Sequence, residues 1–188
     1  MQISKSMSTV IIVTLAACSV AVPAGPVPRK APELSFYDRS GKAISLSNFK
    51  GRVVALEFLF VRSMHCARVA QTLNKLNNDL SLRGFQSIGV AFSAPQSEAN
   101  AAAVGDFIQS LSLAYPVGYT DKENVDRFLD RGKYEVLNIP QVVIIDRAGV
   151  IRAQSGARPG DPKLEDENSL RALLDFLLRE KVPLAYTK

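Results

Sequence analysis

The sequence predicts an α/β fold, a three-layer sandwich built on a mixed central sheet. Three observations lead to this fold class. Strand-like and helix-like segments alternate up to the middle of the chain, a pattern typical of parallel strands joined by right-handed helical crossovers. A hairpin pattern then spans residues 141–154 and adds antiparallel pairing. A helix with a clear leucine stripe follows it toward the end of the sequence.

The first predicted elements are a hairpin and a buried strand. Leu34–Tyr37 and Ala43–Leu46 flank a turn that ends in Gly41, as the strands of a hairpin do. Val53–Val61 is apolar throughout except for Glu57. A run of this length, rich in Val and Phe, is too short for a typical helix, so we expect a central strand covered on both faces.

A long amphipathic helix is predicted after the central strand. Ser63 is suited to cap its start, and Gly84 is suited to end it. Between them the apolar positions recur at helical spacing: Cys66, Val69, Ala70, Leu73, Leu76 and Leu80. We expect the helix to bury this stripe against the sheet.

The remaining elements continue the alternation. Phe85–Phe92 and Tyr115–Gly118 have the composition of strands, and Ser97 is placed to cap a helix between them. Asn124–Arg131 is predicted as a short helix. The hairpin strands are Gln141–Asp146 and Val150–Gln154, and the closing helix carries Leu170, Leu173, Leu174, Leu177 and Leu178 on one face.

Composition excludes several classes of function. The 188 residues suit one domain with a short appendage. The net charge of +5 is modest and no run of Lys and Arg reaches five residues, so we expect no nucleic-acid partner. One histidine and two cysteines are too few for an ordinary zinc or copper site. We therefore predict no metal and no other cofactor; the sequence carries no signal for an oligomeric state.

The first 24 residues have the pattern of a secretory signal peptide, with one lysine followed by an apolar stretch and small residues. Within it, residues 15–18 resemble the bacterial lipobox, in which Cys18 would receive lipid. The alternative is cleavage after Ala24, which would give a soluble periplasmic protein. Residues 25–32 are rich in proline, as expected for an extended, semi-rigid linker. We expect a folded domain over residues 33–183, held at a bacterial membrane outside the cytoplasm.

Two motifs carry a resemblance to a known family. Residues 41–51 precede an apolar strand and a cysteine that opens a helix, and Ile139-Pro140 precedes the strand and turn of residues 141–149. Together these motifs resemble the membrane-anchored, TlpA-like thioredoxins of the redoxin superfamily, over about residues 32–181. The resemblance implies a thioredoxin-like three-layer sandwich and a partner protein that carries a thiol or a disulfide.

The active-site motif departs from that family. The family places Cys-x-x-Cys at the start of the first long helix, whereas this chain has Ser63-Met64-His65-Cys66. By resemblance, Ser63 stands where the exposed, attacking cysteine would be, and only the resolving position keeps a thiol. Arg62 replaces the aromatic residue that usually precedes the motif. Because either processing route removes Cys18 as a redox partner, Cys66 is the single thiol of the expected domain.

The roles of the individual residues leave alternatives open. Cys66 is either a reactive thiol or a small inert core residue. Glu57 is either the proton acceptor that the resemblance implies for Cys66 or a carboxylate paired with a nearby Lys or Arg. His65 either stabilises a thiolate or is an ordinary surface residue. By resemblance, Pro140 is cis and Ile139 docks an extended peptide through its backbone.

Three functions fit these residues. The first is a monothiol redox protein that captures partner thiols through Cys66, and the second is a non-catalytic peptide-binding module. The third is a one-cysteine peroxidase, because residues 63–66 also match the [Ser/Thr]-x-x-Cys of peroxiredoxins. Against the peroxidase, Leu59 stands where that family has a proline, and the family's distant arginine would fall near Pro140.

Overall fold

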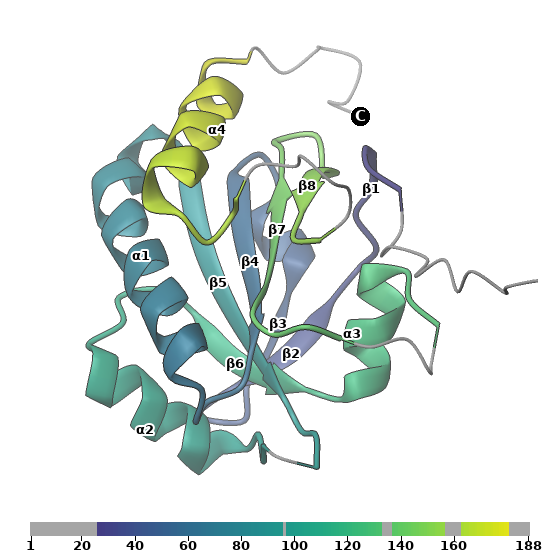
Figure 1. Ribbon diagram of the computed structural model, residues 1–188, viewed down its shortest axis with the longest axis vertical. Helices are drawn as coiled ribbons and strands as arrows, with labels where there is room; N and C mark the ends of the chain where they lie inside the picture. The colour runs from purple at the N-terminus through teal and green to yellow at the C-terminus, as the bar shows by residue number, and fades with distance from the viewer. Residues whose placement is uncertain (1–25, 96, 133–136, 157–162, 181–188) are drawn as a thin grey trace, which may run out of the picture.

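The computed structural model describes residues 26–95, 97–132, 137–156 and 163–180. Eight strands form one sheet in the order β1-β8-β7-β4-β5-β6-β2-β3 (Figure 1). The strands are β1 Arg29–Lys30, β2 Ser35–Asp38, β3 Ala43–Ser45, β4 Val53–Leu59, β5 Phe85–Phe92, β6 Val117–Thr120, β7 Gln141–Ile145 and β8 Val150–Gln154. The helices are α1 Met64–Leu80, α2 Ala101–Leu111, α3 Lys122–Leu129 and α4 Glu167–Arg179, with short 3-10 helices η1 Leu46–Phe49 and η2 Ser81–Arg83.

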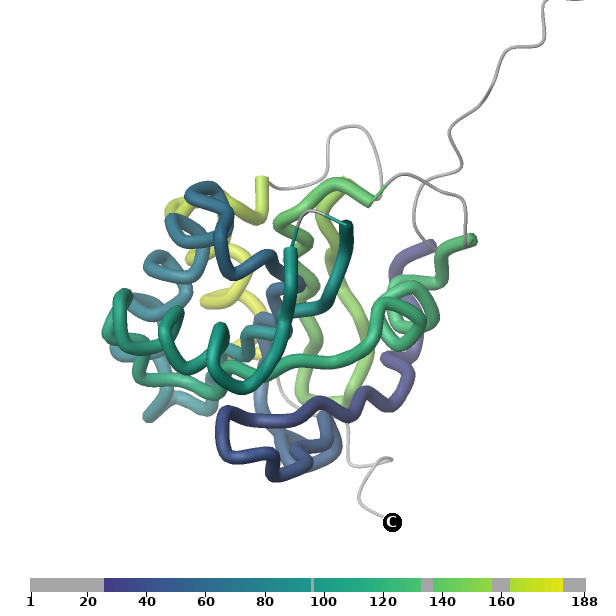
Figure 2. Tube along the Cα trace, turned by 90° about the horizontal axis from the view of Figure 1, so that it is seen from below, coloured from purple at the N-terminus to yellow at the C-terminus, as the bar shows by residue number. Residues whose placement is uncertain are grey.

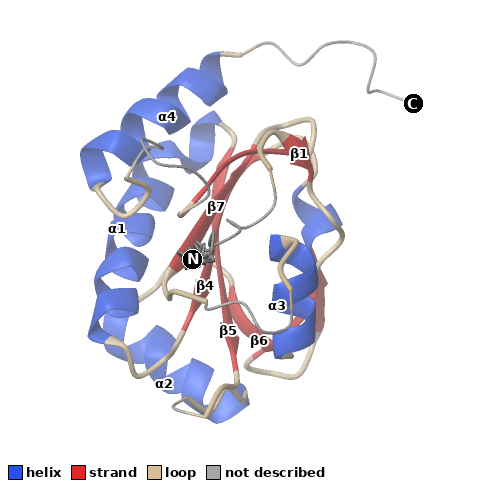
Figure 3. Ribbon diagram, turned by 45° about the vertical axis from the view of Figure 1, so that its right-hand side comes forward, coloured by secondary structure: helices blue, strands red, loops and turns tan. Residues whose placement is uncertain are grey.

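The sheet is mixed, as the sequence predicts. The centre of the sheet, β4, β5 and β6, is parallel, while β7 runs antiparallel to β4 and β8 antiparallel to β7. The hairpin of β2 and β3 joins the other edge through antiparallel pairing of β2 with β6. Helices α1, α2 and α4 cover one face and α3 covers the other (Figure 3). The prediction of a three-layer α/β sandwich is confirmed.

Strand β4 lies between two apolar cores. Its residues Val53, Ala55 and Leu59 pack with α1, α2 and α4, whereas Val54, Leu56 and Phe58 pack on the side of α3. Successive side chains of a strand point to opposite faces. Glu57 therefore faces the layer of α1 and α4, inside the core that also contains Cys66.

The predicted start of the long helix is confirmed. Ser63 is the N-cap of α1, and its Oγ accepts a hydrogen bond from the Cys66 backbone N–H at 3.3 Å. The α-helix ends at Leu80 and continues as η2 to Gly84. Gly84 has φ +93°, a left-handed conformation that glycine adopts without strain and that commonly ends a helix.

Two local predictions in the middle of the chain are wrong. Asn100 caps α2 by accepting the Ala103 N–H at 2.9 Å, whereas Ser97 pairs with Ala94 in an isolated bridge. Strand β6 begins at Val117, two residues later than predicted, and Tyr115 instead packs in the core below α1. In both cases the tertiary structure differs from the cap or strand that the residue types favour locally.

The predicted proline-rich linker is wrong for residues 27–30. Val27 is buried, and Arg29 and Lys30 pair with Ile151 and Val150 as β1. The Arg29 guanidinium also donates to the Phe128 carbonyl and to Gln154 Oε1, and Figure 2 shows this purple segment beside the green α3. This segment therefore forms an edge strand of the sheet, because residues far along the sequence supply its hydrogen-bond partners.

Three predictions lie outside the described residues. They are the signal peptide of residues 1–24, the lipidation of Cys18 and the end of the domain at 181–183. Within the described ranges, no helix is long and apolar enough to cross a membrane.

Candidate functional site

The candidate site lies at one end of the central strands of the sheet, where β4 ends and β7 begins. Gln141 at the start of β7 pairs with Phe58 near the end of β4, so Ile139 and Pro140 reach the same edge as the turn that leads into α1. The Ile139–Pro140 peptide bond is cis, as predicted. Pro140 is buried, and Ile139 is half-buried and packs against both cores. The two sequence motifs are thus brought together by the pairing of β4 with β7.

Cys66 is a buried thiol in the first turn of α1. Its side chain has no exposed surface, and its Sγ accepts a hydrogen bond from the Phe60 N–H at 3.4 Å. Burial raises the pKa of the Cys66 thiol, although hydrogen bonds with Ser63 and Phe60 act in the opposite direction. The neutral thiol is therefore favoured over the nucleophilic thiolate.

Ser63 occupies the entrance to this site. It is half-buried at the N-cap, and its hydroxyl lies close enough to influence the Cys66 thiol. Residues at i and i+3 are neighbours across the first helical turn. The structure therefore brings Ser63 and Cys66 together as the two positions of a Cys-x-x-Cys motif would be.

Glu57 is wholly buried, and neither carboxylate oxygen has a hydrogen-bond partner. Burial raises the pKa of Glu57 well above its ordinary value, and the negative charge of Glu165 raises it further. Burial therefore favours the neutral form of the carboxyl. Among the described residues no cation forms a hydrogen bond with Glu57, so the structure gives no support to the alternative that it pairs with a Lys or Arg.

Glu57 interacts electrostatically with two other buried groups. A charge on Glu57 raises the pKa of the Cys66 thiol. Burial, and to a smaller extent Glu57, raise the pKa of Tyr115, whose hydroxyl donates to the Ala70 carbonyl at 3.3 Å. Sequence analysis missed Tyr115 as a neighbour of the site because it assigned this residue to a strand.

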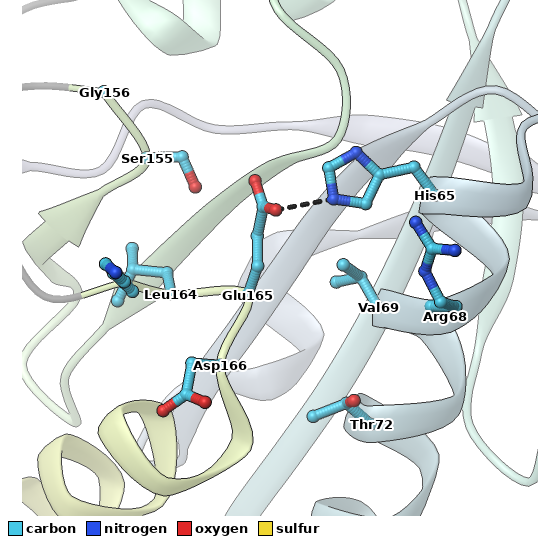
Figure 4. A pocket seen from close by; sticks show the side chains of 10 residues that line it. His65, Arg68, Val69, Thr72, Ser155, Gly156, Leu164, Glu165 and Asp166 are labelled. Atoms are coloured by element: carbon cyan, nitrogen blue, oxygen red, sulfur yellow. Dashed lines mark ion pairs between the residues drawn. The ribbon is translucent and has the colours of Figure 1, made fainter.

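His65 is directed away from the thiol. Its Nε2 lies 2.6 Å from Glu165 Oε2 (Figure 4). The pair joins the first turn of α1 to the segment before α4 and borders a cavity of about 630 Å³. Arg68, Thr72, Ser155 and Lys163 also line this cavity. Glu165 was missed by sequence analysis, since nothing local marks a partner 100 residues away.

The backbone of Ile139 is available to a partner. Neither its N–H nor its C=O hydrogen-bonds to another described residue. Backbone groups without a partner, in a loop that leads into a strand, are able to bond to an extended peptide segment.

Metal-ligating residues do not gather at this edge. In the described part of the chain, no three His, Cys, Asp or Glu side chains lie close enough together to hold a metal ion.

These features define a class of protein. A mixed α/β sandwich, a helix that starts with the thiol motif and a cis-proline at the same edge are the features of the thioredoxin fold. A sequence model of the AhpC/TSA family matches residues 27–154. The chain belongs to this family of thioredoxin-like proteins.

Individual relatives agree with this assignment. The thiol-disulfide oxidoreductase ResA of Bacillus thuringiensis subsp. konkukian is 24% identical over 140 residues, which cover 74% of this chain and 75% of ResA. The thioredoxin-like protein YneN of Bacillus subtilis is 28% identical over 125 residues, covering 66% of this chain and 68% of YneN. A thiol:disulfide interchange protein of Chlorobium tepidum superposes with a TM-score of 0.65 at 20% identity, covering 82% of this chain and 99% of that one. This last likeness shows the fold alone.

Proposed function

We propose that this protein binds a thiol-bearing partner protein outside the cytoplasm and does not turn over disulfides by itself. The observation that carries the proposal is a buried Cys66, whose pKa is raised by burial, next to Ser63, which by resemblance stands where the family has its attacking cysteine. The relatives named as thiol-disulfide oxidoreductases support a partner that carries a thiol or a disulfide.

A single thiol limits the chemistry. When the Cys66 thiolate attacks a partner disulfide, one new S–S bond forms and the partner releases one thiolate. A second cysteine would then break the mixed disulfide, but the described residues contain no other cysteine. Release therefore requires an external thiol, so the natural protein is suited to capture a partner rather than to reduce one repeatedly.

Glu57 is proposed to limit the reactivity of Cys66. Burial raises the pKa of this carboxyl and favours its neutral form, which is unable to accept the thiol proton. Its proposed role as proton acceptor begins only at a pH above its raised pKa.

The partner is proposed to dock along the Ile139–Pro140 edge. The unpaired N–H and C=O of Ile139 are suited to bond an extended segment, which would bring the partner next to Ser63 and Cys66.

The proposed location rests on the sequence. Residues 1–24 would direct export, and lipid on Cys18 would anchor the protein. Mass spectrometry of the mature N-terminus tests this: a chain that begins with a lipidated Cys18 supports the anchor, and a chain that begins at Gly25 contradicts it.

The decisive experiment restores the missing cysteine. Ser63→Cys should form a disulfide with Cys66, since the two positions are neighbours across the first helical turn. The variant should reduce insulin in the presence of dithiothreitol, whereas the natural protein should not. Met64→Cys is the matched control, because Met64 is 79% exposed and lies two residues from Cys66, where helical side chains do not face each other.

Three results would contradict the proposal. Turnover by the natural protein as fast as that of the Ser63→Cys variant would show that one thiol suffices. Failure of the variant to form the disulfide would show that Ser63 does not occupy the attacking position. Consumption of peroxide by the natural protein would favour the one-cysteine peroxidase, which needs a thiolate at Cys66.

A further inference from the structure

We propose that the surface around the start of α1 selects partner segments with acidic side chains, and that Arg62 determines this specificity. The relevant surface is a basic rim, defined here as Arg62, Arg68 and Lys163. The inference rests on the proposed docking of an extended segment at Ile139.

Two cavities flank the start of α1, and each contains part of the basic rim. Arg68 and Lys163 line the cavity that the His65–Glu165 pair borders (Figure 4). Arg62 lines a second cavity of about 320 Å³ together with Ser93, Ala94, Pro95, Ser97 and Glu98. A segment bound across the start of α1 would therefore pass a cation on either side.

The cations of the basic rim are not paired at short range, although hydrogen bonds with Ser169 and, to a smaller extent, the charge of Lys163 lower the pKa of the Asp166 carboxyl, and Glu98 lines the Arg62 cavity. Arg62, Arg68 and Lys163 are exposed, and none forms an ion pair with a described residue. Lys75, farther along α1, differs in this respect, because it pairs with Glu167 at 2.8 Å.

The acids beside the two cavities, in contrast, are already bound within the protein. Glu165 pairs with His65, Asp166 accepts the Ser169 N–H, and Glu98 accepts from the Asn100 side chain. These contacts occupy oxygens of the three carboxylates but leave the charges of Asp166 and Glu98 in place. Arg62, by contrast, forms no ion pair with a described residue, so its guanidinium is free to bind a carboxylate, and complementary charge favours an acidic partner.

A second, independent observation lies in the Arg62 cavity. Ser97 is 5% exposed, and its Oγ has no hydrogen-bond partner among the described residues. A buried hydroxyl without a partner is unfavourable. A carboxylate held by Arg62 would supply an acceptor for this hydroxyl, and the N-terminus of the 17-residue α1 adds positive potential at the same place.

The sheet register sets the spacing of the acidic residue. Gln141 of β7 and Val90 of β5 both pair with Phe58, on opposite sides of β4. Adjacent strands lie about 4.8 Å apart, so β7, which follows Ile139, and β5, which precedes Ser93 of the Arg62 cavity, are separated across β4 by about 10 Å. An extended chain covers this distance in about three residues. The acidic side chain is thus expected about three residues from the one that pairs with Ile139.

The test measures how fast peptides are captured by an exposed thiol at position 63. The full chain carries Ser63→Cys together with Cys66→Ala, so that only one thiol in the domain reacts. The probes are glycine- and serine-rich decapeptides whose single cysteine is activated with 5-thio-2-nitrobenzoate. The introduced thiolate attacks the peptide sulfur, a protein–peptide S–S bond forms, and the coloured aromatic thiolate leaves. The peptides differ at one position only. It holds Glu, Gln or Lys and lies up to three residues before or after the cysteine.

The Glu peptide should react about three- to tenfold faster than the Gln peptide at low salt, and the Lys peptide should be the slowest. High salt should remove this preference. Adding Arg62→Glu should reverse the order, whereas Lys50→Glu, the same change of charge before the opposite end of β4, should not. A Ser97→Ala change should lower the Glu-over-Gln ratio without altering the rate of the Gln peptide.

Two outcomes would overturn the inference, and they are distinguishable. Equal rates for Glu and Gln peptides, both far above the rate of the activated cysteine alone, would leave docking intact and refute charge selection. If no peptide reacts faster than activated cysteine alone, docking at Ile139 fails and the inference fails with it.

Discussion

The clearest energetic consequence of the structure concerns Glu57→Gln. This change replaces a buried carboxyl by an uncharged group of the same size. Glu57 has no exposed surface and no hydrogen-bond partner, and burial raises its pKa well above the ordinary value. The structure therefore predicts that Glu57 makes the stability of the natural protein fall as the pH rises.

The sign and the size follow from proton linkage. In the unfolded chain the carboxyl has a pKa of about 4.3, so above about pH 5 the unfolded state has released a proton that the folded state keeps. The free energy of unfolding then falls by about 1.4 kcal/mol for each pH unit. Below the pKa that Glu57 has in the unfolded chain, no unfolding free energy is lost. Above the raised pKa that it has in the folded protein, no further unfolding free energy is lost. Glu57→Gln removes this dependence.

Urea denaturation at a series of pH values, with both proteins unfolding in one step, measures the effect. The quantity to follow is the difference in unfolding free energy between the natural protein and the variant, because other titrating groups cancel in it. Glu123→Gln serves as the control, since Glu123 is exposed and should leave the pH dependence unchanged. A difference that stays constant from about pH 5 to about pH 8 would refute the argument, because it would mean that Glu57 has the same pKa folded and unfolded.

Two further predictions concern the thiol. Because a charge on Glu57 raises the pKa of the Cys66 thiol, the pH profile of Cys66 alkylation in Glu57→Gln should move to lower pH; an unchanged profile would show that the two groups do not interact. Ser63→Ala should raise the pKa of Cys66, since the Ser63 hydroxyl lowers it, and should cost about 1 kcal/mol of stability through loss of the N-cap. Alkylation and urea unfolding of the same variant check both effects, and a thiol that becomes more reactive would contradict the first.

Much of the fold follows from local sequence patterns. Strand β5 has the predicted bounds Phe85–Phe92, and α1 starts directly after the predicted cap, Ser63. Both are determined by side chains that are close in sequence: an apolar run, a hydroxyl that bonds the first turn, and a stripe with the period of a helix. The thiol motif and the Ile139–Pro140 motif were located by the resemblance to the TlpA-like thioredoxins.

Other features depend on partners that are distant in sequence. The proline-rich segment around Arg29 was expected to be a linker, but it becomes β1 because Ile151 and Gln154 supply its partners. Ser97 is a suitable cap by type, yet Asn100 takes that place in α2.

The state of the site likewise depends on tertiary structure. From its sequence, Glu57 was expected to be protonated, paired or functional, since an isolated carboxylate is costly to bury. Only the surrounding core shows that no described cation pairs with it and that burial raises its pKa, which favours the neutral form. The pairing of His65 with Glu165, and hence the direction of the imidazole away from Cys66, also joins segments 100 residues apart. The sequence by itself therefore determined which residues meet at this edge, whereas burial and distant contacts decided which of them carry charge and which are free to react.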